Sequence, residues 1–202
     1  MISMVILILG IVISLGGYLR LIGLYLKYRK IKYNKFSCEV VLDLLNDESS
    51  INLIESKDLV FSKYNIKRRM IKLTSDTYNS NNYYQVAVAS LLSGFALSKN
   101  EYLEVIAKVF REIKIFSYSA IIGSIVALVV NNGVDAKIGI IILMVISGYQ
   151  FIINLINSMA IEKVRISEDI KKIMNKFNSV NTMFFVGSLI YIVRFVTLLL
   201  GK

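Results

Sequence analysis

The stretch from Ile138 to Ile161, IGIIILMVISGYQFIINLINSMAI, contains no Asp, Glu, Lys or Arg. A helix needs about 20 mostly apolar residues to cross the hydrocarbon core of a bilayer, so this stretch is long enough to span a membrane. Of the 202 residues in the chain, 55% are hydrophobic, which is more than is typical of water-soluble domains. The sequence therefore predicts a mainly α-helical, polytopic membrane protein.

Three further stretches have the length and composition of spans. Residues 1–26 are interrupted only by one arginine, and residues 115–134 carry no charge. Residues 178–200 contain Arg194, which we expect to extend toward the lipid headgroups. The first span lacks a basic n-region and a small-x-small cleavage site, so we expect it to remain as an anchor. Its Gly16-Gly17 pair would let a neighbouring helix approach closely.

A fifth uncharged run, residues 77–98, is less suited to crossing a membrane. It includes a polar Asn-Ser-Asn-Asn sequence, and only residues 83–97 form an apolar stretch. That length is typical of a buried or interfacial helix. We therefore predict about four transmembrane helices, at residues 1–26, 115–134, 138–161 and 178–200.

The distribution of basic residues predicts the orientation. Residues 27–114 contain 15 basic and ten acidic side chains, and residues 162–176 contain five and three, whereas the connection at 131–137 has one basic side chain. Because flanking Lys and Arg stay cytoplasmic, we expect an N-terminal anchor (1–26) with its terminus outside the cell, a cytoplasmic domain (27–114) and a C-terminal membrane bundle (115–202). The net charge of +10 is then explained by contact with anionic membrane lipid, and we predict no binding of nucleic acid.

The cytoplasmic domain is expected to be a small α+β domain. Ser37 is a predicted N-cap, followed by apolar residues at helical spacing as far as Leu45. Residues 58–62 and 69–74 are β-prone and are separated by Tyr64-Asn65, which predicts a short β-hairpin with a turn at that pair. The apolar helix at 83–97 follows, and then a predicted amphipathic helix over residues 102–113.

This order of elements, together with the sequences YNIKRRMIKLT at 64–74 and VAVAS at 86–90, resembles the membrane-bound neutral zinc metallopeptidases of Gram-positive bacteria. The family has an N-terminal anchor, a small domain with a zincin helix and a C-terminal membrane bundle. The resemblance implies that the helix at 83–97 is a degenerate zincin-type helix.

The resemblance places the family's His-Glu-x-Gly-His motif on Leu91-Leu92-Ser93-Gly94-Phe95, where only the glycine is retained. In an active zincin, two His at i and i+4 bind Zn²⁺ and the intervening Glu activates the metal-bound water. Leu91 and Phe95 cannot bind a metal, and Leu92 cannot accept a proton. Glu162 stands where the family's third ligand is expected, as a remnant of that ligand or simply as a solvated residue at the end of a span.

The chain contains no His, which excludes Ser-His-Asp and Cys-His catalysis. The nearest Ser-Lys pair is Ser93 or Ser98 with Lys99. We therefore predict a pseudopeptidase with no catalytic residue, no metal ligand and no cofactor, which binds or positions another membrane protein or an active relative. The alternatives are an unrelated multi-pass protein with a structural or transport role and an active metallopeptidase with atypical ligands.

Overall fold

A computed structural model describes the chain except for residues 1, 47–49, 58–61, 66, 99–132 and 201–202. The predicted span at 115–134 and the predicted helix at 102–113 therefore lie outside the described residues. The described chain is mainly helical with a small three-stranded sheet. It divides into two compact units, which we call the helical unit (described residues within 1–21, 133–154 and 179–202) and the sheet unit (described residues within 22–98, and 155–178).

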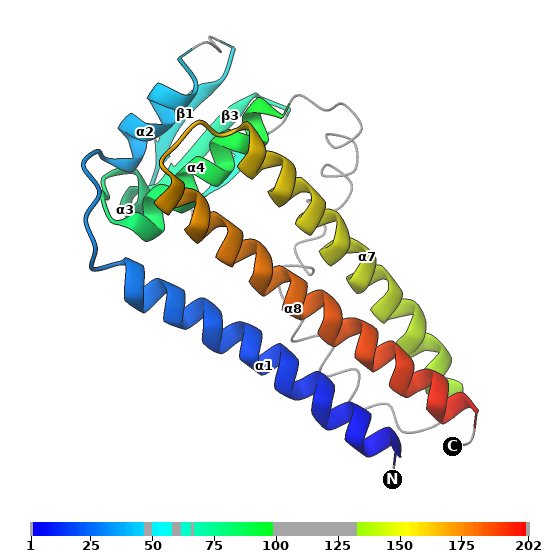
Figure 1. The fold of residues 1–202 in the computed structure, drawn as a ribbon. Coiled ribbons are helices and arrows are strands. Elements are labelled where there is room, and N and C mark those ends of the chain that lie inside the picture. The colour runs from blue at the N-terminus through cyan, green and yellow to red at the C-terminus, as the bar shows by residue number, and fades with distance from the viewer. Residues whose placement is uncertain (1, 47–49, 58–61, 66, 99–132, 201–202) are drawn as a thin grey trace. The chain divides into compact units, whose positions relative to one another are not determined.

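Among the described residues, three helices are long and apolar enough to cross a membrane. They are α1 (Ile2–Tyr28), α7 (Gly133–Lys163) and α8 (Glu168–Leu199), as Figure 1 shows. These helices cover three of the four predicted spans. Helices α7 and α8 continue beyond the predicted spans into the basic segment at 162–176 and leave only residues 164–167 between them.

The core of the helical unit forms where α8 packs against α7. Tyr191 and Phe195 of α8 are buried together with Leu143 and Ile146 of α7. Helix α1 lies close to α8, since a Cβ added at Gly17 would be 2.6 Å from Cε1 of Phe184. The prediction that the glycine pair of α1 permits a close helix approach is therefore confirmed.

Polar side chains in the helical unit are buried between helices. The Ser188 hydroxyl of α8 donates a hydrogen bond of 2.9 Å to Oε1 of Gln150 on α7. Arg194 is only 5% exposed, and its guanidinium carbon lies 5.5 Å from the centre of the Phe195 ring. Arg194 is therefore covered by its surroundings in the helical unit, and its extension toward the lipid headgroups stays a prediction.

The sheet unit contains three strands, β1 (Asn52–Ser56), β2 (Lys63–Asn65) and β3 (Met70–Thr74), in the order β1-β3-β2. Strand β2 is antiparallel to β3 and β1 is parallel to it. Strand β3 lies within the second predicted strand, whereas residues 58–61 of the first predicted strand lie outside the described residues. The position of the predicted turn is wrong. Tyr64 pairs with Ile71 within the ladder, and the reversal occurs before β3, where Arg69 has a φ of 45°.

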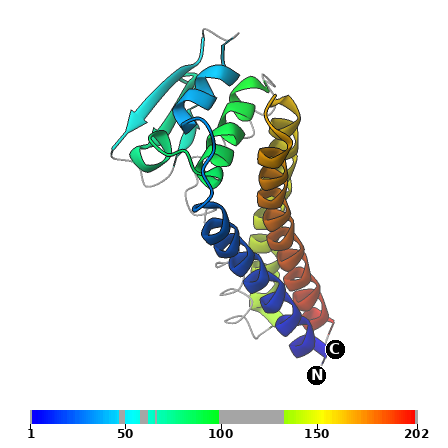
Figure 2. The same ribbon diagram turned by 60° about the vertical axis from the view of Figure 1, so that its left-hand side comes forward.

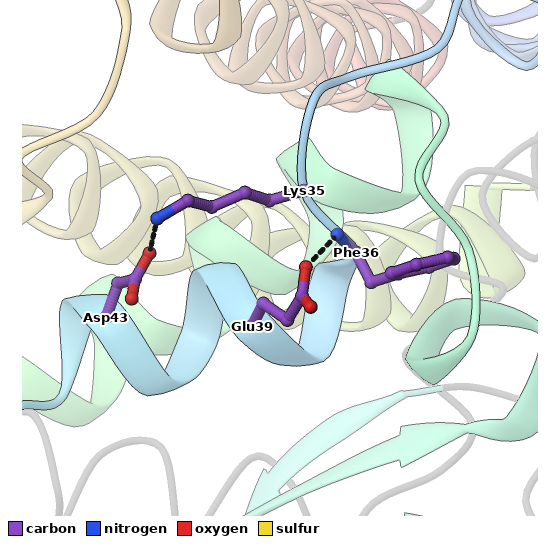
Figure 3. Close-up of polar contacts among 4 residues, drawn as sticks. All are labelled: Lys35, Phe36, Glu39 and Asp43. Atoms are coloured by element: carbon purple, nitrogen blue, oxygen red, sulfur yellow. Dashed lines mark hydrogen bonds and ion pairs between the residues drawn. The ribbon is translucent and has the colours of Figure 1, made fainter.

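Helix α2 (Ser37–Leu44) begins one residue before its predicted start, because Phe36 rather than Ser37 is the N-cap. The backbone N–H of Phe36 donates to Oε2 of Glu39 at 2.8 Å (Figure 3). The N–H and the hydroxyl of Ser37 both donate to the carbonyl of Ser80, at 2.8 and 2.9 Å. Ser37 thus ties α2 to the segment between the one-turn helix α3 (Ser75–Tyr78) and α4 (Tyr83–Leu97).

Helices α2 and α4 cover one face of the sheet (Figure 2). Their contact with it forms the sheet cluster, which consists of Val41, Leu45, Ile71, Leu73, Ala89, Leu92 and Ala96. The opposite side of α4 packs against the end of α7 and the start of α8. This helix-end cluster consists of Val40, Val86, Ala87, Ile161, Val164, Ile170, Ile173 and Met174. Helix α4 is therefore apolar around its circumference because it is buried on both sides.

Candidate functional site

The helix predicted at residues 83–97 is present as α4 with those bounds. Its start is fixed by Asn82, whose side-chain oxygen accepts a hydrogen bond of 2.8 Å from the N–H of Gln85. An Asn at the N-cap satisfies one of the backbone donors that a helix leaves unpaired in its first turn. The N–H of Tyr83 donates to the carbonyl of Ile31 at 3.0 Å, so the start of α4 is also held by the segment that follows α1.

The three degenerate motif positions do not share one environment. Leu91 packs against the helix-end cluster, whereas Leu92 belongs to the sheet cluster and Phe95 packs against that same cluster. Leu92 is 9% exposed. Two metal-binding imidazoles at i and i+4 must point to one ion, whereas Leu91 and Phe95 contribute apolar contacts to two different clusters. These side chains offer no electron pair to Zn²⁺ and do not fit a zincin centre.

Gly94, the one position that matches the family's motif, lies in close contact with the end of α7. A Cβ added at Gly94 would be 2.3 Å from the carbonyl oxygen of Ala160, 2.8 Å from its carbonyl carbon and 2.9 Å from Cγ2 of Val164. Two of these three atoms belong to the backbone, so no rotamer change could relieve the overlap. Glycine at position 94 is therefore explained by helix packing without reference to catalysis.

The serines of α4 are engaged within the helix. Ser93 is fully buried, and its hydroxyl donates to the carbonyl of Ala89 at 3.1 Å. Ser90 is also buried and donates to the carbonyl of Val86 at 2.8 Å. A buried hydroxyl that is already bonded to the preceding turn is poorly placed to attack a substrate. Lys99, the proposed partner of Ser93 or Ser98, lies outside the described residues.

Glu162 is exposed near the end of α7. Ala160 and Ile161 of α7 are buried beside it, as is Val164 directly after α7, and these residues form the side that contacts α4. Successive helical residues are about 100° apart, so the carboxylate of Glu162 points away from that side. The structure therefore does not bring Glu162 to the degenerate motif positions. No group of three His, Cys, Asp or Glu side chains capable of holding a metal is found within the described ranges.

The sheet unit also contains a cleft that no sequence pattern predicted. The cleft has a volume of about 520 Å³ and is bordered by the segment after α1, by α2 and by the connection between α7 and α8. Its charged residues are Lys35, Asp43 and Arg165. The signal available in the sequence was a cluster of Lys and Arg directly after each of two spans, which by itself indicates the topology and a general attraction to anionic lipid but no cleft.

One ion pair lies at the edge of the cleft. Nζ of Lys35 donates a hydrogen bond to Oδ2 of Asp43 at 2.6 Å (Figure 3). The hydrogen bond and the charge of the Asp43 carboxylate raise the pKa of Lys35. Both side chains are about half exposed, at 49% and 56%, so water screens their attraction and the pair contributes little to stability.

The chain matches no family model, no curated protein and no solved structure. The assignment of function therefore depends on the arrangement of its own residues.

Proposed function

We propose that this chain is a multi-pass protein of the cell membrane, related to the zinc metallopeptidases and without catalytic activity, which binds or positions another membrane protein. The observation that carries the proposal is the packing of α4. Leu91, Leu92 and Phe95 fill two apolar clusters at the positions where an active zincin has its ligands and its base. The contact of Gly94 with Ala160 supports a fold in which this helix is retained as a packing element.

The first experiment measures zinc and peptidase activity. Full-length protein is extracted from membranes in mild detergent, and its zinc content is determined by inductively coupled plasma mass spectrometry beside an active zincin prepared in the same way. We expect far less than one zinc per chain and no cleavage of casein. Stoichiometric zinc, together with casein cleavage that a chelator abolishes, would favour an active metallopeptidase with atypical ligands instead.

The proposed topology has four spans, the N-terminus outside and the sheet unit in the cytoplasm. It is supported by the predominance of basic residues in the segments assigned to the cytoplasm. Cys38 is the single cysteine of the chain and is partly exposed. We expect a membrane-impermeant maleimide to label it only after the cells are permeabilised. In a Cys38→Ser background, Asn132→Cys should be labelled in intact cells, and labelling of native Cys38 in intact cells would contradict the orientation.

A partner is sought by affinity capture from native membranes in mild detergent, with an unrelated multi-pass protein as the control bait. We expect specific and reproducible recovery of at least one other membrane protein. Recovery of the same proteins by both baits would argue for the alternative, an unrelated membrane protein with a structural or transport role.

A further inference from the structure

The cleft of the sheet unit carries more positive than negative charge. Lys35 and Arg165 contribute two cations, and Asp43 contributes one carboxylate, which is paired with Lys35. Arg165 is exposed, and it forms no ion pair with any residue that the structure describes. One guanidinium is therefore available at the cleft for an anionic ligand.

The remaining walls would suit a ligand that is polar at one end and apolar at the other. Val40 and Leu44 of α2 and Ile166 of the α7 to α8 connection supply apolar surface. Ser167 adds a hydroxyl next to the first residue of α8. A guanidinium beside hydroxyl and apolar groups can bind a phosphate through paired N–H donors while it leaves room for a glycerol backbone.

The residues of the cleft follow the ends of two helices that are apolar enough to be spans. Helix α1 ends at Tyr28 and α7 at Lys163, and the lining residues Lys35 and Arg165 lie a few positions further along the chain. If both helices cross the bilayer, as proposed above, these positions lie near the headgroup layer. Basic pockets at the cytoplasmic ends of spans bind the headgroups of anionic lipids.

We infer that this cleft binds the phosphate of an anionic phospholipid, with Arg165 as its principal contact. The inference rests on the proposed membrane placement and is independent of the pseudopeptidase proposal. The shared chemistry is a phosphate group, which a lipid or a soluble phosphate could supply. The Asp43 carboxylate lowers the affinity of the cleft for the phosphate, because it neutralises Lys35 and repels the negatively charged ligand.

The test uses full-length protein in a zwitterionic detergent, so its result does not depend on membrane orientation. Binding of dioctanoyl phosphatidylglycerol, dioctanoyl phosphatidylcholine and inorganic phosphate is measured by native mass spectrometry. We expect phosphatidylglycerol to bind more tightly than either of the others. Arg165→Gln should weaken its binding about tenfold, as expected for the loss of one charge-assisted contact, and Arg165→Lys should retain part of the affinity.

Two further variants separate a specific site from general attraction. Lys163→Gln removes the same charge two residues away, outside the cleft, and should change affinity by less than about twofold if the charge acts only at long range. Asp43→Asn releases Lys35 and should tighten binding several-fold, which damage to the fold could not do. Equal losses in Arg165→Gln and Lys163→Gln, or no gain in Asp43→Asn, would overturn the inference. Equally tight binding of inorganic phosphate would overturn the lipid as the ligand.

Discussion

Replacement of Gly94 by alanine tests the packing of α4 directly. The added Cβ would lie 2.3 Å from the Ala160 carbonyl oxygen, so α4 and α7 must separate to accommodate it. Overpacking of a core typically costs about 1 to 3 kcal/mol of stability. Because the added Cβ clashes with backbone atoms, which cannot rotate away, we expect a loss near the upper end, about 3 kcal/mol. The better helix propensity of alanine returns about 1 kcal/mol. We expect a net loss of about 2 kcal/mol, which corresponds to a fall in Tm of roughly 4–8 °C.

The assay is thermal unfolding in detergent, followed by far-UV circular dichroism. Gly23→Ala is the matched control, because Gly23 is also helical and a Cβ added there meets nothing within 4 Å. That control should be neutral or slightly stabilising, since it gains helix propensity without a clash. Equal or higher stability of Gly94→Ala relative to the native chain would refute the close contact between α4 and α7.

Three further predictions follow from other parts of the fold. Leu92→Glu should lower stability by about 3 kcal/mol or more, because it buries an unpaired carboxylate. The same change at exposed Leu42 should have a small effect, and equal melting curves of the two variants would contradict this prediction. Ser188→Ala removes the hydrogen bond to Gln150 and should cost about 1 kcal/mol or less, measured by thermal unfolding; a larger loss would indicate a further role for the hydroxyl. Burial raises the pKa of Tyr84, with a smaller contribution from Tyr25. The unfolded chain therefore loses this proton first, and stability should fall as pH rises above about 10. The fall should be smaller in Tyr84→Phe, and identical pH profiles would contradict the assignment.

The features that depend on local composition could be predicted from the sequence. The apolar runs gave helices at three predicted spans, and the short apolar run at 83–97 gave a buried helix with the expected bounds. The sequence before the last predicted span also contains a helical pattern, which indicates the early start of α8. Ile170, Ile173, Met174 and Phe177 have the i, i+3, i+4, i+7 spacing of a helix face, and the first three are buried.

Features that depend on distant residues were not predictable in this way. Strand β1 pairs with β3 in parallel across a long connection, and its sequence, Asn-Leu-Ile-Glu-Ser, has no regular alternation of apolar and polar residues. Ser37 has a side chain that is typical of an N-cap, but its hydroxyl donates a hydrogen bond to the carbonyl of Ser80 instead. The cleft combines residues near position 40 with Arg165, and no local pattern indicates that these segments meet.

The packing of α4 also bears on whether a zinc-binding motif could be introduced at positions 91–95 through a few substitutions. A His at position 91 would replace contacts in the helix-end cluster, and a His at position 95 would replace contacts with the sheet cluster. Each change would place an imidazole among apolar side chains, where a polar group without a partner is destabilising. A Glu at position 92 would add a buried charge. Introduction of the motif would therefore disrupt contacts in both clusters before any metal could stabilise the result, so the packing of α4 disfavours a zinc site at these positions.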